Sequence, residues 1–181
     1  MIFTPTPLKG SYLIDPSPRG DNRGWFMRTF CAKEFEQIGH TKPWVQMNHS
    51  FTAEAGTIRG MHYQLPPHSE IKLVRCIAGA VFDVVIDVRK ESPTFLRWFG
   101  AELSAENKKM MYIPEGFAHG FQTLTGNCEL IYCHSEFYLP EAEGGLRYDD
   151  PELDIQWMAE AKNISERDQQ HPLITKKFTG I

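Results

Sequence analysis

Short apolar runs, separated by glycine and proline, fill the middle of the chain. The runs are rich in Val, Ile, Phe, Tyr and Thr, and they recur at even spacing. Many short strands of this kind predict an all-β sandwich or barrel. The expected strands are residues 44–51, 57–64, 71–78, 80–89, 95–103, 109–113, 118–125 and 128–138.

Helical periodicity is weak. Residues 31–38 are expected to form a short helix, and the stretch from residue 151 onward should hold one or two more. The segments before about residue 30 and after about residue 140 are expected to wrap the barrel. The chain has no internal repeat and no low-complexity linker, so residues 1–181 are expected to form a single domain.

The strand predicted at residues 80–89 shows strict alternation. One face is apolar throughout, and the other carries Asp83 and Asp87 between valines. Such a half-polar face favours contact with solvent. In a barrel that holds a ligand, the same face would line the cavity.

Composition narrows the choice of partners and of compartment. A net charge of −4 and a pI of about 6.0 leave no basic footprint for a nucleic-acid backbone. The first ten residues lack a signal-peptide core, and no apolar run approaches the length of a membrane span. The four cysteines include no C-x-x-C pair. We therefore expect unpaired thiols in a reducing cytoplasm, without nucleic-acid or membrane partners.

The strand predicted at residues 57–64 carries polar side chains that do not suit a sealed core. Simple alternation places His62 and Gln64 on one face and Arg59 on the other. A lone histidine in a strand is more often structural, but histidine also titrates near neutral pH. His62 is therefore a candidate general base. A common pocket for His62 and Arg59 requires a distortion, for which Gly60 is the candidate.

Other unusual side chains surround this candidate. Lys72 has apolar neighbours on its own face, and His119 stands between phenylalanines. Asp168 fits a capping box that begins at Ser165, which is its structural alternative to a role in chemistry. Residues of a credible pocket wall share one face of the last predicted strand: Leu130, Tyr132, His134, Glu136 and Tyr138.

A metal site is the first alternative to consider. The spacing P-x-G-x-x-H at residues 114–119 matches the second metal motif of cupin barrels. The first motif needs H-x-H, but residues 62–64 read HYQ, and His68 and Glu70 follow at an unusual spacing. The ligand set is incomplete, so we expect a cupin-like fold without a metal. A metal-dependent cupin oxygenase or isomerase remains an alternative.

Longer strings point to one family. They are RGMHYQ, KLVRCIAGAVFDVVIDVRKESPTF, LSAENKKMMYIPEGFAHGFQTL, DDPELDIQW and SERD, with DNRGWF and VQMNHS nearer the N-terminus. Together with Tyr132 and Tyr138, these strings resemble the dTDP-4-dehydrorhamnose 3,5-epimerase family. The likeness runs from about residue 10 to residue 172 in one register.

The resemblance implies a cupin-type β-jelly-roll barrel with short flanking helices. It also implies a homodimer with exchanged N-terminal strands, and no metal or organic cofactor. The expected substrate is a nucleotide-linked 4-keto-6-deoxy sugar, whose 4-ketone acidifies the hydrogens on C3 and C5. A base removes a proton from one face, and an acid returns one from the other.

The same resemblance assigns roles to individual residues. His62 would be the base, held by Asp168. Tyr132 would be the acid, and Lys72 would stabilise the enolate oxygen at C4. The expected substrate contacts are Arg23 and Arg59 with the diphosphate, His119 with the sugar, Tyr138 beside the pocket, and Gln46, Asn48, Glu143 and Arg167 toward the nucleotide end.

Two departures from the family pattern bear on the nucleotide. Arg28 stands at a usually acidic position, and Met47 interrupts the usual Q-D-N. An arginine only donates hydrogen bonds, which would suit cytosine better than thymine. A CDP-linked substrate, and inversion at a single carbon, are therefore alternatives. A sugar-nucleotide-binding barrel without activity is disfavoured, because binding alone requires neither a base nor an acid.

Overall fold

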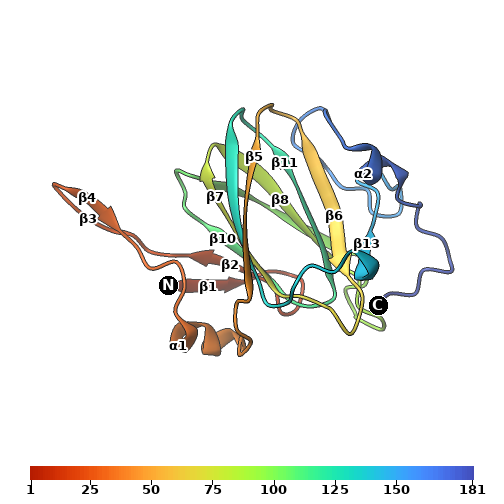
Figure 1. The fold of residues 1–181 in the computed structure, drawn as a ribbon, viewed down its shortest axis with the longest axis horizontal. Coiled ribbons are helices and arrows are strands. Elements are labelled where there is room, and N and C mark those ends of the chain that lie inside the picture. The colour runs from red at the N-terminus through yellow and green to blue at the C-terminus, as the bar shows by residue number, and fades with distance from the viewer.

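Two antiparallel sheets packed face to face form the body of the protein, as a computed structural model of residues 1–181 shows (Figure 1). In the six-stranded sheet the order is β1 (Ile2–Pro5), β2 (Tyr12–Asp15), β10 (Met110–Ile113), β7 (Lys72–Ala78), β12 (Cys128–His134) and β5 (Gln46–Thr52). In the five-stranded sheet it is β13 (Glu143–Gly145), β6 (Ile58–Gln64), β11 (Phe117–Thr123), β8 (Ala80–Asp87) and β9 (Trp98–Ser104).

All the predicted strands are present, with shifts of a few residues at their ends, and the expected jelly roll is confirmed. The expected short helix is also confirmed, as α1 (Ala32–Phe35) followed by a 3₁₀ turn, Glu36–Ile38. Near the C-terminus only α2 (Glu166–Gln170) forms, besides a 3₁₀ turn at Pro140–Ala142. None of these helices has the length and apolar character needed to cross a bilayer.

The five-stranded sheet is buried on both of its faces. Its inner face packs against the other sheet, where Val85 and Phe121 join the main core cluster. Its outer face is covered by the segment after β13, through Leu153, Ile155 and other apolar residues. The C-terminal segment therefore wraps the barrel, as the sequence predicts.

The carboxylates of β8 correct one expectation. Alternation favoured a face in solvent, yet Asp83 and Asp87 are both 0% exposed. Asp87 accepts hydrogen bonds from Arg89, Ser92 and Thr94 at the end of the strand. The solvent prediction was wrong because the alternation of one strand does not reveal that the other sheet covers its polar face.

A small hairpin leaves the body near the N-terminus. Strands β3 (Arg19–Asp21) and β4 (Gly24–Phe26) form a two-stranded ribbon that projects away from both sheets (Figure 1). Trp25 and Phe26 lie on it with exposed fractions of 56% and 75%. The sequence pattern did not predict β1–β4 or β13 as strands.

A bulge in β6 resolves the problem of alternation around His62. On β11, His119 pairs with His62 and Phe121 pairs with Arg59, so two steps on β11 match three on β6. Gly60 lies at the bulge with φ of +126°, and a Cβ there would lie 2.5 Å from the Gly120 Cα. The extra residue resets the alternation, and Arg59 and His62 border the same cavity.

Candidate active site

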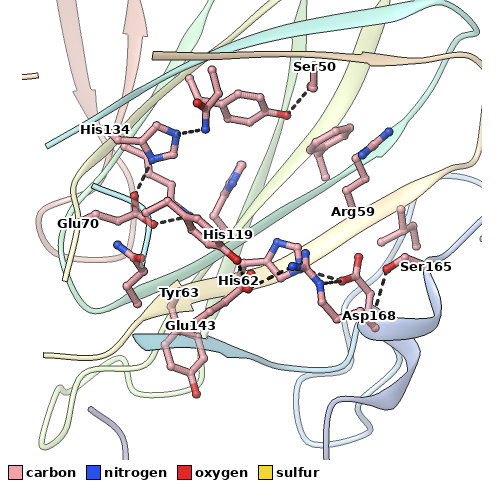
Figure 2. Close-up of a pocket in the computed structure, with 18 of the residues that line it drawn as sticks. Ser50, Arg59, His62, Tyr63, Glu70, His119, His134, Glu143, Ser165 and Asp168 are labelled. Carbon is pink, nitrogen blue, oxygen red and sulfur yellow. Dashed lines mark hydrogen bonds and ion pairs between the residues drawn. The ribbon is translucent and has the colours of Figure 1, made fainter. Parts of the chain in front are cut away.

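A cavity of about 640 Å³ opens between the two sheets (Figure 2). Strands of both sheets and the segment leading into α2 contribute to its wall. Most of the lining is polar or charged, unlike the core that surrounds it. The sequence-predicted residues that line it are Gln46, Asn48, Arg59, His62, Lys72, His119, Tyr132, Tyr138, Glu143, Arg167 and Asp168.

His62 and Asp168 form a hydrogen-bonded pair at one side of the cavity. His62 Nε2 lies 2.8 Å from Asp168 Oδ1, and the Gly60 N–H donates to Asp168 Oδ2 at 3.2 Å. Burial works to raise the pKa of Asp168, but the His62 hydrogen bond and charge lower it to about 2. With Asp168 accepting the Nε2 hydrogen, Nδ1 is the nitrogen whose lone pair is free to take a proton.

Ser165 explains why Asp168 stands where it does. The Asp168 N–H donates to Ser165 Oγ at 3.1 Å, so Ser165 caps α2 as the sequence predicts. The Asp168 carboxylate, however, turns away from the helix toward Gly60 and His62. Its backbone begins the helix while its side chain forms the pair, so the two sequence interpretations are compatible.

Arg167 adds positive charge beside this pair. Its Nη2 lies 3.2 Å from His62 Nε2, and its Nη1 donates to Glu143 Oε2 at 3.1 Å. The Tyr138 hydroxyl donates to the same Glu143 oxygen at 2.8 Å. These residues form a polar rim next to the His62–Asp168 pair, where the sequence analysis predicts the nucleotide end of the substrate.

His119 forms a second histidine–carboxylate pair, deeper in the cavity. Its Nε2 lies 2.8 Å from Asp83 Oδ2, and its side chain is only 6% exposed. The other Asp83 oxygen is buried without a hydrogen-bond partner. The sequence identified His119 as a site residue but did not identify Asp83, although it noted that this face of β8 could line a cavity.

Tyr132 faces the cavity from the opposite sheet. Its hydroxyl lies 2.9 Å from Ser50 Oγ, and its ring packs edge-on to His119. Burial raises the pKa of Tyr132, so the phenol keeps its proton. It is therefore a neutral hydroxyl that can donate a proton.

Lys72 lies on the same wall and is paired with a residue that the sequence prediction left out of the site. Its Nζ is 3.1 Å from Glu70 Oε1, and the second Glu70 oxygen lies 2.6 Å from His134 Nδ1. Glu70 was considered only as a metal ligand, and His134 only as part of a strand face. Alternation could have indicated both residues, because Glu70 shares the alternation of Lys72, and His134 lies on the same strand face as Tyr132.

Three predicted substrate contacts differ in where they lie. Arg59 borders the cavity and donates to Thr52 Oγ1 at 3.1 Å. Arg23 lies on the projecting hairpin, paired with Asp21 and 85% exposed. Arg28 is paired with Glu34. Within one chain, neither Arg23 nor Arg28 lines the cavity.

The cavity side chains that could bind a metal are mostly hydrogen-bonded to one another in separate pairs. Only His62, Asp168 and His171 come together as a group of three. The Arg167 guanidinium, 3.2 Å from His62 Nε2, places a positive charge beside that group and disfavours a cation there. His119, the histidine of the cupin-like spacing, is bonded to Asp83 and belongs to no such group.

Comparison with known proteins places the chain in a family. The family model described as dTDP-4-dehydrorhamnose 3,5-epimerase matches residues 5–176. A dTDP-4-dehydrorhamnose 3,5-epimerase of Shigella flexneri is 44% identical over 164 residues, 90% of each chain. The crystal structure of the Bacillus anthracis enzyme of that name, with TDP and PPi bound, is 39% identical with a TM-score of 0.92, covering 96% of this chain and 99% of that one.

A structure with a bound sugar nucleotide is also similar. It is the dTDP-6-deoxy-D-glucose-3,5-epimerase of Legionella pneumophila in complex with dTDP-4-keto-L-rhamnose. It is 40% identical, with a TM-score of 0.90, and the match covers 95% of this chain and 92% of that one. Fold and comparisons together define a cupin-type sugar-nucleotide isomerase.

The chain belongs to the dTDP-4-dehydrorhamnose 3,5-epimerase family. The resemblance identified from the sequence strings is thereby confirmed. The relatives are named as dTDP-sugar epimerases, so the comparisons do not favour the CDP-linked alternative or the metal-dependent cupin alternative.

Proposed function

We propose that this chain epimerises a nucleotide-linked 4-keto-6-deoxy sugar of the dTDP-4-dehydro-6-deoxyglucose type, at C3, at C5 or at both. One observation carries the proposal: a base and an acid face one cavity from opposite sheets. His62, paired with Asp168, comes from β6, and Tyr132 comes from β12. A pocket that only binds would need no such pair.

The proposed reaction needs no redox step. His62 Nδ1 takes the proton from the carbon next to the ketone, and the C–H electron pair moves into the enolate. The Lys72 ammonium stabilises the negative charge that develops on the C4 oxygen. Tyr132 then gives its proton to the same carbon from the other face, which inverts that centre. A proton from solvent restores the tyrosine, and His62 releases its own.

The remaining residues would bind rather than react. Arg59, and Arg23 delivered by a second subunit, would hold the diphosphate, because guanidinium groups pair well with phosphate oxygens. His119 would bind the sugar or help polarise its carbonyl, with Asp83 behind it. Gln46, Asn48, Tyr138, Glu143 and Arg167 would form the wall toward the nucleotide.

We further propose a homodimer with exchanged N-terminal strands. The projecting hairpin bears exposed Trp25 and Phe26, which a monomer would leave in water. Strand β5 lies at the edge of its sheet and presents Met47 and Phe51, 67% and 55% exposed. Deleting residues 18–27 should convert a dimer into a monomer in light scattering. A monomeric wild-type protein would contradict the exchange.

We also propose that the chain is a single domain in a reducing, cytoplasmic compartment. One domain spanning residues 1–181 fits the continuous pair of sheets. The four cysteines are unpaired, which supports a reducing, cytoplasmic location.

Incubation in D₂O tests the reaction directly. The protein would receive dTDP-4-keto-6-deoxyglucose or its CDP analogue, and NMR would report deuterium at C3 and C5. We expect uptake from the dTDP form at one or both carbons, together with an inverted product. Uptake at a single carbon would narrow the reaction to one centre. Faster uptake from the CDP form would change the proposed nucleotide from dTDP to CDP. No uptake from either form would overturn the proposed function.

A further inference from the structure

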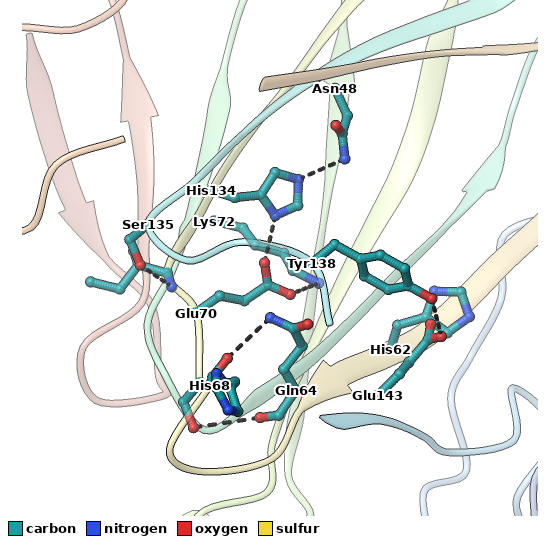
Figure 3. Close-up of polar contacts among 12 residues, drawn as sticks. Asn48, His62, Gln64, His68, Glu70, Lys72, His134, Ser135, Tyr138 and Glu143 are labelled. Atoms are coloured by element: carbon teal, nitrogen blue, oxygen red, sulfur yellow. Dashed lines mark hydrogen bonds and ion pairs between the residues drawn. The ribbon is translucent and has the colours of Figure 1, made fainter. Parts of the chain in front are cut away.

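A chain of polar side chains lies behind Lys72 along one wall of the cavity (Figure 3). Lys72 meets Glu70 at 3.1 Å, and Glu70 meets His134 Nδ1 at 2.6 Å. On its other side, His134 Nε2 lies 3.3 Å from Asn48 Nδ2. Gln46 continues the chain, with its Nε2 3.2 Å from Asn48 Oδ1. The proposed reaction gives Glu70 and His134 no role.

One backbone group fixes the direction of every hydrogen bond in this chain. The Tyr138 N–H can only donate, and it meets Gln46 Oε1 at 3.1 Å. The Gln46 NH₂ group therefore points to the Asn48 oxygen, and the Asn48 NH₂ group points to His134. An amide NH₂ group only donates, so His134 Nε2 must accept.

This order leaves His134 as its neutral Nδ1–H tautomer. The Nδ1–H donates to Glu70, which stays fully ionised. Burial works to raise the pKa of Glu70, but the His134 hydrogen bond and the Lys72 charge hold it below its usual value. One carboxylate thus faces one ammonium, with the two side chains only 9% and 10% exposed. Such compensation offsets the high cost of burying either charge alone.

We propose that Glu70 and His134 are positioning residues that direct the Lys72 ammonium at the oxygen developing on C4. The inference rests on the proposed function, because that reaction gives Lys72 its role. Glu70 uses one of the three ammonium hydrogens and leaves two for the substrate. In this proposal Glu70 acts on the reaction through Lys72, and His134 acts through Glu70.

A double-mutant cycle tests whether Glu70 acts through Lys72. Lys72→Met should lower kcat by about 10²- to 10³-fold, as loss of an oxyanion donor does. Glu70→Gln keeps the shape but removes the charge, and should lower kcat about tenfold through a misplaced ammonium, with KM little changed. In the Lys72→Met background, Glu70→Gln should have no further effect. A full tenfold loss there would overturn the proposal.

A buried carboxylate outside the cavity supplies the matched control. Asp87 is fully buried and, like Glu70, ion-paired, in its case with Arg89, but it does not line the cavity. Asp87→Asn should lower the melting temperature and leave kcat unchanged. An equal kcat loss in Asp87→Asn and Glu70→Gln would mean that Glu70 only stabilises the fold, and would overturn its positioning role.

The tautomer gives a sharper test at His134. Glutamine offers an NH₂ donor group and an acceptor oxygen without charge, and so can replace the donor and acceptor nitrogens of the neutral tautomer, whereas leucine offers neither. His134→Gln should therefore keep kcat within about threefold, and His134→Leu should lose about tenfold, the loss expected for a misplaced ammonium. Equal losses in both variants would overturn the proposed tautomer.

The tautomer can also be read without any substrate. ¹⁵N NMR of the wild-type protein should show a protonated Nδ1 and a bare Nε2 on His134. A protonated Nε2 would contradict the hydrogen-bond order. The activity assays separate the two proposals: wild-type protein inactive in D₂O would overturn the function, whereas an active wild type with an unaffected Glu70→Gln variant would overturn only the inference.

Discussion

The two histidine–carboxylate pairs of the cavity are similar in geometry and differ in setting. His62 and His119 are direct cross-strand partners on β6 and β11, and each Nε2 lies 2.8 Å from an aspartate oxygen. The His62 side chain is 24% exposed, and its partner comes from α2, about a hundred residues away. The His119 side chain is 6% exposed, and its partner lies on the adjacent strand β8.

This difference in setting matches the two roles proposed for the pairs. A base must reach the substrate and exchange its proton with solvent, which an open position beside a short helix permits. A binding group gains from a fixed direction, which a buried position between two strands provides. Exposure and the source of the aspartate, rather than the pair itself, separate the proposed base His62 from the proposed binding residue His119.

The largest expected effect comes from removing the base. His62→Ala should lower deuterium uptake and turnover by about 10²- to 10⁴-fold, the range for a general base. His119→Ala should slow the reaction less, because exchange needs a base but tolerates a weaker hold on the sugar. Rates of C–H exchange measured by NMR check both. A greater loss for His119→Ala would reverse the assignment of the two pairs.

The bulge that presents His62 should be the next most sensitive feature. Gly60→Ala places a Cβ 2.5 Å from the Gly120 Cα, at a φ that L-residues rarely adopt. We expect a loss of about 3 kcal/mol in unfolding free energy, measured by denaturant titration. Gly39→Ala is the control, because that glycine also has a positive φ but nothing lies within 4 Å of its added Cβ. Equal losses would mean that strain, rather than close approach, fixes the bulge.

Asp168 should contribute less, and in a way that depends on pH. Its pKa of about 2 lies below the ordinary aspartate value of 3.8, because the hydrogen bond and charge of His62 outweigh the effect of burial. When the pKa of a carboxyl group is lower in the folded state than in the unfolded state, the group stabilises the fold at every pH above its unfolded-state pKa. This stabilisation is lost as the pH falls through the folded-state pKa. Asp168→Asn should therefore cost about 2 kcal/mol at pH 7, and the difference from wild type should vanish between about pH 4 and pH 2.

Urea titrations at several pH values measure this dependence. The exposed Asp21, paired with Arg23 on the hairpin, supplies a control whose replacement by asparagine should change stability little. A constant difference between Asp168→Asn and wild type down to pH 2 would show that the Asp168 carboxylate does not stabilise the fold through its charge.

The sequence predicts the strands and the main side chains of this site better than the contacts that support those side chains. Alternation and punctuation located the central strands, and cavity-lining His62 and Lys72 stood out as unusual in their runs, whereas Tyr132 and Asp168 were assigned their roles by the family resemblance. No local pattern indicates that Asp83 would be buried, because its cover comes from the other sheet. Likewise Glu70 and His134 meet across 64 residues of chain, a pairing that only the sheet register creates.

Replacement of Arg28 should have the smallest effect of these substitutions. Its position also shows that the type of one residue does not by itself identify its partner. The sequence suggested a contact with the base, but its guanidinium donates to Glu34, whose other oxygen accepts from the N-terminal ammonium. Exposed pairs of this kind contribute little to stability. Arg28→Ala should therefore leave both the melting curve and the ratio of dTDP to CDP turnover unchanged, whereas Arg59→Ala, at the cavity, should raise KM for both. A shift in the nucleotide ratio for Arg28→Ala would show that Arg28 reaches a substrate in the assembled enzyme.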